Sequence, residues 1–155
     1  MFRMNMREFR KLTASYKRRG GKYVKPNRDA QSGANNTEKA FNLYILGGRG
    51  KFHPKPFVVS RVSSRRYTAD YRYEYEGVPV IVEVKGSYRL PSEGRARLAW
   101  ELAAEQNPGS VFAWARNVKT TMWDIEVWYR GGKTTSRAIC YTTAEFHKLL
   151  QGVLS

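Results

Sequence analysis

The sequence predicts an α/β or α+β domain with a mixed central β-sheet flanked by helices. Two alternating segments at 66–75 and 78–85 surround Gly77, which indicates an antiparallel hairpin. A helical segment and a short apolar segment follow, and this order is typical of a crossover to a parallel strand. A second pair of strand-like segments surrounds Gly131 and Gly132. One parallel connection between two hairpins gives a mixed sheet.

Local patterns place the elements of the first half. Thr37 is a candidate N-cap for a helix over 38–46, and the glycine-rich run after Leu46 would end that helix. A strand is expected at 57–62, followed by the two strands of the first hairpin.

The second half continues with helices and strands in turn. Ser92 is a candidate N-cap for a helix that ends at residue 106, because Asn107-Pro108-Gly109 is a strong stop signal. Thr142 or Thr143 is expected to cap the last helix. The remaining strands are expected at 110–115, 124–130 and 137–141, and the last helix at 144–150.

Composition limits the classes of protein that the chain can be. Its 155 residues fit one domain, and its 41% hydrophobic content argues against a wholly disordered chain. No apolar run approaches the roughly 20 residues that cross a bilayer, and residues 1–7 lack the apolar segment of a secretory signal. The lone Cys140 cannot form an internal disulfide and is expected to be buried. We expect an intracellular protein without a membrane partner.

The net charge of +15 predicts attraction to a polyanion. The charge is uneven, because residues 1–28 hold ten Lys or Arg and one acid. We therefore expect a basic, partly flexible arm over 1–36 and a single domain over 37–155. Two sets of residues are candidates to contact DNA: Arg18, Arg19, Lys22 and Lys25 in the arm, and Arg49, Lys51, Arg89, Arg95, Arg97, Arg116 and Lys119 in the domain.

Asp70, Glu83 and Lys85 are the candidate catalytic residues. Glu83 and Lys85 are two residues apart, so on one strand they point to the same face. Asp70 lies on the preceding strand of the expected hairpin, with the polar side chains of that strand. Phosphodiester hydrolysis needs an activated water and neutralisation of developing negative charge, and hard divalent cations on oxygen ligands supply both. Asp70, Glu83 and the Val84 carbonyl would hold Mg²⁺, while Lys85 orients water or steadies the transition state.

The same residues resemble a known family. The segment Tyr67-Thr68-Ala69-Asp70-Tyr71, followed by Val80 to Gly86 with its Glu-Val-Lys-Gly ending, is similar to the PD-(D/E)xK nuclease superfamily. More narrowly, it resembles the phage endonuclease I type of Holliday-junction resolvase, although Ala69 stands where that family usually has proline. The resemblance covers roughly residues 30–120.

The resemblance implies further properties of the chain. Glu38, which follows Ser32-Gly33, matches an upstream acid of the family and would be a fourth catalytic and metal-binding residue. The fold would be restriction-endonuclease-like, and Mg²⁺, with Mn²⁺ as a substitute, would be the cofactor. The protein would be an intertwined homodimer, bridged by residues 47–62. It would be a phage protein that cuts four-way or other branched DNA during recombination in the cytoplasm of the host cell.

Two alternatives stay open on the sequence. The first is a non-catalytic nucleic-acid-binding module, in which the acids and the lysine form a structural ion-pair face. The second is a restriction or homing type of nuclease from the same superfamily, which would cut duplex DNA. All three functions predict DNA affinity that falls with salt.

Overall fold

The computed structural model describes residues 34–60 and 65–155. Arg18, Arg19, Lys22 and Lys25, and most of the predicted basic arm, lie outside these residues. Ala34–Ser155 forms one compact unit. Its elements are α2 (Asn36–Tyr44), β1 (Lys51–Phe52), β2 (Phe57–Ser60), β3 (Arg65–Tyr67), β4 (Tyr71–Tyr75), β5 (Val78–Lys85), α3 (Glu93–Gln106), β6 (Val111–Lys119), β7 (Met122–Tyr129), β8 (Thr134–Cys140) and α4 (Thr143–Leu154).

A mixed six-stranded sheet forms the centre of the unit, with the strand order β1-β4-β5-β6-β7-β8. Only β5 and β6 pair in parallel, and α3 connects them. The other neighbours are antiparallel. The unit is therefore α+β, with three helices against a mixed sheet, as the sequence predicted. A separate two-stranded sheet is formed by β2 and β3.

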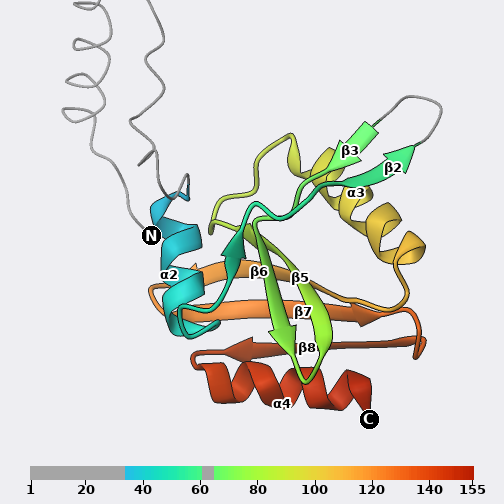
Figure 1. Cartoon of the computed structure of the whole chain (residues 1–155). Coiled ribbons are helices and arrows are strands. Elements are labelled where there is room, and N and C mark those ends of the chain that lie inside the picture. The colour runs from blue at the N-terminus through green and yellow to red at the C-terminus, as the bar shows by residue number, and fades with distance from the viewer. Residues whose placement is uncertain (1–33, 61–64) are drawn as a thin grey trace, which may run out of the picture. The chain divides into compact units, whose positions relative to one another are not determined.

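The helices cover opposite faces of the large sheet (Figure 1). On one face, α2 and α4 pack on alternate residues of the strands, among them Val80, Val82 and Val84, and the Phe41 ring lies 5.0 Å from the Trp123 ring. On the other face, α3 and the β2–β3 pair bury Ile81, Trp100 and Phe112. This two-sided burial explains why β5 is nearly continuously apolar up to Glu83.

The first hairpin is confirmed, but its first strand is shorter than predicted. β4 and β5 pair around Glu76 and Gly77, both of which have positive φ as the tightest hairpin turns require. The single strand predicted over 66–75 is wrong, because β3 ends at Tyr67 and β4 begins at Tyr71. Each strand has its own partner, so the chain changes layers across the three residues between them.

Other boundaries also differ from the predictions. The N-cap of α2 is Asn35 rather than Thr37, with a capping box formed by Asn35 and Glu38. Ser92 occupies the N-cap position of α3, but its side chain makes no capping hydrogen bond. β6 runs on to Lys119, so Arg116 and Lys119 lie within the strand instead of after it. The second hairpin, the Thr142 cap of α4 and the burial of Cys140 are confirmed.

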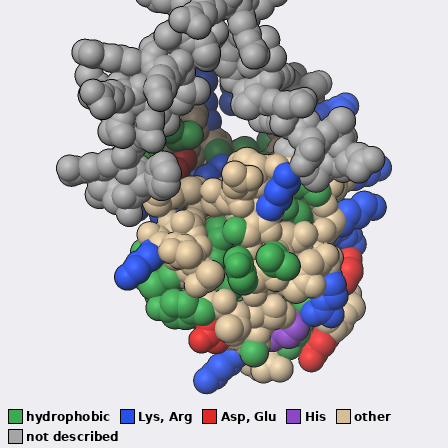
Figure 2. Space-filling model, turned by 90° about the vertical axis from the view of Figure 1, so that its left-hand side faces the viewer, with side chains coloured by type: hydrophobic (Ala, Val, Ile, Leu, Met, Phe, Trp, Pro, Cys, Tyr) green, Lys and Arg blue, Asp and Glu red, His purple; other side chains and the backbone are tan. Residues whose placement is uncertain are grey.

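Basic side chains are spread around the edge of the face in Figure 2, and hydrophobic ones gather at its centre. Large exposed apolar residues include Leu43 and Tyr44 on α2. No helix in the described part of the chain is long and apolar enough to cross a membrane.

Candidate functional site

The β4–β5 hairpin places Asp70 beside Glu83. Tyr71 pairs with Val82, and the Asp70 amide donates to the Val82 carbonyl at 3.0 Å. Asp70 comes one residue before Tyr71 and Glu83 one residue after Val82, so the antiparallel register sets the two acids next to each other. The structure thus brings together the two acids that the sequence singled out.

The Asp70 carboxylate is oriented by the main chain of β5. Its Oδ2 atom accepts a hydrogen bond from the Val84 amide at 2.7 Å. Burial, and then the charge of Glu83, raise the pKa of Asp70 to about 7, against the lowering effects of the Val84 amide and Lys85. The raised pKa means that the surroundings of Asp70 disfavour its charged form, so a bound cation would favour ionisation of this carboxyl.

Glu83 is 6% exposed and is the only buried charged side chain of the described residues. Its Oε2 atom accepts from the Tyr67 hydroxyl at 2.7 Å, and its Oε1 atom lies 2.5 Å from Lys85 Nζ. Burial, followed by the charge of Glu83, raises the pKa of Tyr67 well above its ordinary value, so Tyr67 stays a hydrogen-bond donor. The carboxylate of Glu83 is therefore held in position by two donors, the neutral Tyr67 hydroxyl and the Lys85 ammonium group.

Lys85 is the last residue of β5, and its ammonium group contacts an acid and an aromatic ring. It pairs with Glu83, and its Nζ atom lies 5.2 Å from the centre of the Trp114 ring. The side chain is 20% exposed, so the ammonium group is held in place yet open to water on one side. Its position on the same face as Glu83 is as predicted.

Glu38 is close enough to act on the site electrostatically. Its charge contributes to the raised pKa values of Asp70 and Tyr71. Both of its carboxylate oxygens accept hydrogen bonds from Asn35, at 2.9 Å and 2.8 Å, within the capping box of α2. A role for Glu38 as a metal ligand would require its carboxylate to turn from Asn35, and stays a prediction.

The donor set fits a magnesium ion that keeps most of its water ligands. No cluster of three or more His, Cys, Asp or Glu able to hold a metal is found among residues 34–60 and 65–155. Magnesium commonly takes only one or two carboxylates from a protein, and Asp70 and Glu83 supply two. A divalent cation would also offset the repulsion between these acids. The Val84 carbonyl as a further ligand remains a prediction, since only the Val84 amide contacts Asp70.

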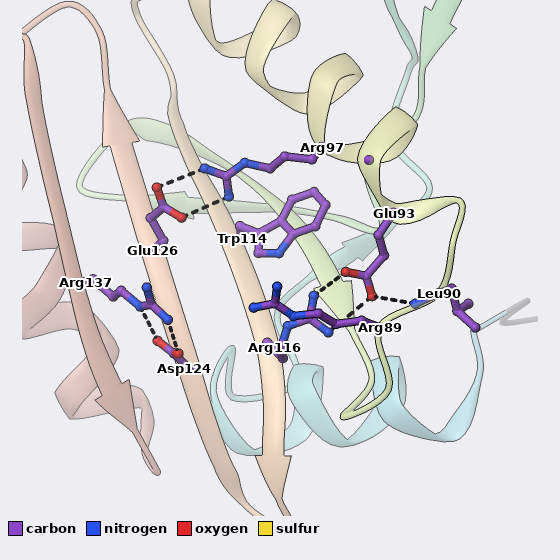
Figure 3. Close-up of a pocket in the computed structure, with 10 residues that line it drawn as sticks. Arg89, Leu90, Glu93, Arg97, Trp114, Arg116, Asp124, Glu126 and Arg137 are labelled. Carbon is purple, nitrogen blue, oxygen red and sulfur yellow. Dashed lines mark hydrogen bonds and ion pairs between the residues drawn. The ribbon is translucent and has the colours of Figure 1, made fainter.

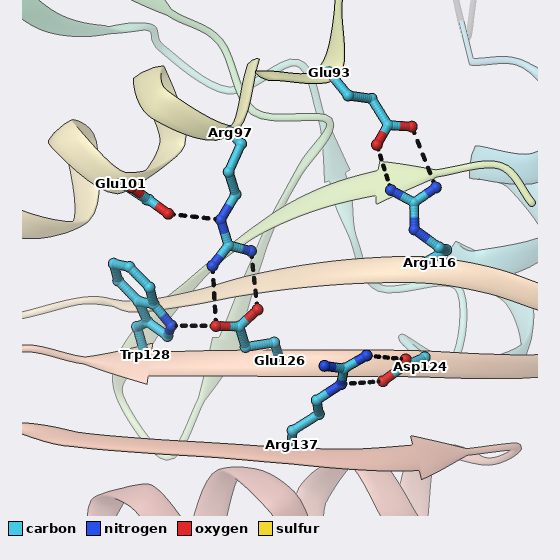
Figure 4. Close-up of polar contacts among 8 residues, drawn as sticks. All are labelled: Glu93, Arg97, Glu101, Arg116, Asp124, Glu126, Trp128 and Arg137. Atoms are coloured by element: carbon cyan, nitrogen blue, oxygen red, sulfur yellow. Dashed lines mark hydrogen bonds and ion pairs between the residues drawn. The ribbon is translucent and has the colours of Figure 1, made fainter. Parts of the chain in front are cut away.

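Two of the predicted DNA contacts are engaged with acids on the α3 face (Figure 4). Arg97 forms a two-pronged pair with Glu126, with nitrogen–oxygen distances of 2.9 and 3.0 Å, and also contacts Glu101. Arg116 pairs with Glu93 and donates to the Gly86 carbonyl. These arginines join α3 to β6 and β7. Their charges are matched by acids within the protein.

A pocket of about 380 Å³ lies over these pairs (Figure 3). Arg137 lines it and pairs with Asp124, while Arg89 at its rim is exposed. Hydrogen bonds from Arg116 and Arg137 lower the pKa values of Glu93 and Asp124 respectively. Burial tends to raise the pKa of Glu126, but the bonds from Arg97 and Trp128 outweigh that effect and lower it.

The other predicted DNA contacts of the domain are exposed. They are Arg49 after α2, Lys51 on β1, Arg89 after β5, Arg95 on α3 and Lys119 at the end of β6. Arg49 also donates to the Tyr73 hydroxyl at 2.8 Å. Their contact with DNA stays a prediction.

Sequence reasoning missed Tyr67 as a site residue. In the single strand predicted over 66–75, Tyr67 would share a face with Tyr71 and Tyr73. The break between β3 and β4 instead turns it toward Glu83. One signal was present: a strand of ten residues is long compared with the usual five or six, so a break was to be expected. Trp114 was also missed as a neighbour of Lys85, because the expected crossover gives the direction of the strand at 110–115 but not its register against β5.

No protein-family model, characterised protein or solved structure matches this chain. The geometry of the site is therefore the main basis for assigning a function.

Proposed function

We propose that the protein is a magnesium-dependent endodeoxyribonuclease that cuts branched DNA. The observation that carries this proposal is the pair of the buried Glu83 and the partly buried Asp70, with Lys85 on the same face as Glu83. Asp70 and Glu83 are both shielded from water, and among the residues that the structure describes Lys85 is the single cation paired with them. Ionisation of both carboxyl groups is therefore unfavourable unless a further cation binds.

Asp70 and Glu83 would hold the metal. Bound magnesium would supply a water of lowered pKa and neutralise charge on the phosphate. The Val84 amide keeps Asp70 oriented, and the Tyr67 hydroxyl keeps Glu83 oriented. Both contacts come from the rigid β-structure around the site, which suits a reaction that needs fixed carboxylates.

Lys85 has a separate task. Its ammonium group contacts Glu83, and its side chain is partly exposed. From there it would donate a hydrogen bond to the attacking water or to a phosphate oxygen as negative charge develops. Trp114 restricts its side chain, which favours a single position for the ammonium group.

The branched substrate rests on the resemblance to endonuclease I type resolvases and on the net charge of +15. We extend the proposal to a restriction-endonuclease-like fold, for which the mixed sheet and the α3 crossover between β5 and β6 are necessary features. The intertwined homodimer is part of the same proposal, since two symmetric cuts need two sites at a fixed separation.

A non-catalytic DNA-binding module is the second candidate. The 2.5 Å contact between Lys85 and Glu83 favours this candidate, because an ion pair with a purely structural role would have the same geometry. The module would bind DNA without cutting it. A nuclease of duplex DNA is distinguished from a resolvase by its substrate alone.

The test is cleavage of a labelled four-way junction and of its linear duplex arms, with magnesium or with EDTA. We expect paired cuts near the branch point that need magnesium. Equal cutting of the duplex would remove the junction preference, and binding without cutting in magnesium or manganese would overturn the nuclease. Asp70→Asn should abolish cleavage if Asp70 belongs to the site. Glu105→Gln, at the surface end of α3, is the control that also removes one negative charge.

A further inference from the structure

A second pocket, of about 780 Å³, lies at the β1–β4 edge of the sheet. We call it the basic groove. It is lined by the basic residues Arg49, Lys51, Lys55 and Arg72, the acid Glu74, and Pro54, Pro56, Phe57, Tyr73 and Ile81. Its volume falls within the range that holds a drug-sized molecule, so it has room for a phosphate with its neighbouring sugars.

The basic groove has an excess of positive charge. Glu74 is its single acid and is paired with Arg72 at 2.8 Å. Lys51 and Lys55 are exposed, and neither forms an ion pair with an acid among the described residues. In the pocket of Figure 3, by contrast, Arg97, Arg116 and Arg137 are each matched by an acid. The groove is therefore the better place for an anion from outside.

Part of the groove is held in position before any ligand binds. The Arg49 guanidinium donates to the Tyr73 hydroxyl, which is in turn 2.7 Å from His147 Nε2 on α4. Pairing of β1 with β4 sets Lys51 directly opposite Arg72. The Arg49 guanidinium, which Tyr73 already holds, loses little conformational entropy when it binds a phosphate.

The groove adjoins the candidate site. Ile81 lines the groove and lies two residues before Glu83, on the same face of β5. The Phe57 ring of the groove stacks on Tyr67, with ring centres 6.3 Å apart, and Tyr67 donates to Glu83. Two residues of a strand span about 7 Å, roughly the spacing of neighbouring phosphates along an extended strand.

We infer that the basic groove binds the backbone phosphates of the DNA strand that flank the phosphate at Asp70 and Glu83. The identification of the ligand as substrate DNA rests on the proposed function. The groove adds Lys55 to the predicted DNA contacts and assigns it, with Arg49 and Lys51, to one strand beside the cut.

The first test is DNA binding without catalysis. The salt dependence of junction binding is measured in EDTA for the wild type, for Lys51→Gln/Lys55→Gln and for a control, Lys133→Gln/Lys148→Gln. The control lysines are equally exposed but lie in the β7–β8 turn and on α4. Loss of two phosphate contacts should lower the slope of log K against log salt by about 1.8 in the groove variant only. Equal changes in the two double variants, or no change in either, would overturn the inference.

The second test locates the contact. Neutral methylphosphonates at the two positions beside the cleaved bond should weaken wild-type binding, but not binding by Lys51→Gln/Lys55→Gln. An equal loss in both proteins would place the groove elsewhere on DNA and overturn the inference. If the wild type fails to cut any DNA while the slopes still differ, the nuclease proposal fails and the groove stands as a nucleic-acid-binding site.

Discussion

Two groups of charged residues share the α3 face of the sheet, and they differ in how their charges are matched. The candidate site holds Asp70 and Glu83 with Lys85, and the pKa of Asp70 is raised to about 7 by burial and by Glu83. The second group, here called the arginine cluster, has three acids whose pKa values are all lowered by their arginines: Glu93 with Arg116, Asp124 with Arg137, and Glu126 with Arg97.

The difference distinguishes a balanced set of ion pairs from an unbalanced one on the same face of the sheet. In the arginine cluster each acid has an arginine, so the charges are balanced and the pairs tie α3, β6, β7 and β8 together. In the candidate site two acids share one lysine, and the imbalance favours a further cation. Strongly perturbed carboxyl groups of this kind tend to mark functional sites.

Replacement of Lys85 should have the largest effect. Lys85→Ala is expected to lower the rate of junction cleavage by about 10²–10³-fold, because it removes a donor that acts on developing charge. Binding of the junction should stay within about threefold, since one partly buried lysine adds little to a basic surface. Lys148→Ala, on the exposed side of α4, is the control and should cleave normally. Equal rates for both variants would assign Lys85 to structure.

Replacement of Arg97 should affect stability rather than cleavage. Arg97→Met removes the guanidinium group, which lies 4.5 Å from the centre of the Trp100 ring and 5.2 Å from that of Trp128. It leaves Glu126 without its cationic partner, although the Trp128 indole still donates to it. A fully buried pair broken this way costs about 3–5 kcal/mol, and the side chain of Arg97 is 27% exposed, so we expect about 2 kcal/mol. Urea unfolding measures the loss. A cleavage defect at unchanged stability would show that the arginine cluster takes part in catalysis.

Asp70→Asn should stabilise the metal-free protein. The folded-state pKa of Asp70 is raised to about 7, so the unfolded state releases this proton first, and stability is lost as the pH rises from about 4 to 7. Asparagine removes that loss and can still accept from the Val84 amide. We expect a gain on the order of 1 kcal/mol at pH 8 in EDTA, and none at pH 4. Destabilisation at pH 8 would show that the charge of Asp70 is already balanced.

The acids of the arginine cluster should show the opposite pH dependence. Because the folded-state pKa of Asp124 is lowered, its contribution is present at neutral pH and is lost as the pH falls below about 4. The Arg137 side chain is 66% exposed, so Arg137→Gln should cost only about 0.2–1 kcal/mol at pH 7 and less at pH 3. Thermal unfolding at the two pH values measures the difference. A larger loss at pH 3 would contradict the pairing.

Local signals were sufficient for some elements and not for others. The bounds of β5 were predicted as observed, because an apolar run between Gly77 and Gly86 leaves little choice. The N-cap of α2 was missed although Asn35 and Glu38 have the spacing of a capping box. The length of the segment 66–75 was a signal for a break, but the place of the division into β3 and β4 depends on which strands each part pairs with, and the sequence alone did not show that.

The candidate site was predicted in its acids and lysine, because hairpin register alone brings Asp70 to Glu83. The roles of Arg97 and Arg116 were not predictable, since Glu126 and Glu93 come from other elements and only the tertiary fold pairs them. The excess of cations in the basic groove was not predictable either, because it depends on the pairing of β1 with β4.

The most direct test of whether Asp70 and Glu83 form a metal centre is a titration of the protein with Mn²⁺. The electron paramagnetic resonance signal of the free ion measures how much manganese is bound. The wild type and Glu126→Gln should bind manganese with similar affinity, while Asp70→Asn should bind at least about tenfold more weakly. Magnesium should displace the bound manganese. If the wild type binds no manganese, or if Asp70→Asn binds it as well as the wild type does, the unbalanced acids of the candidate site do not form a metal centre.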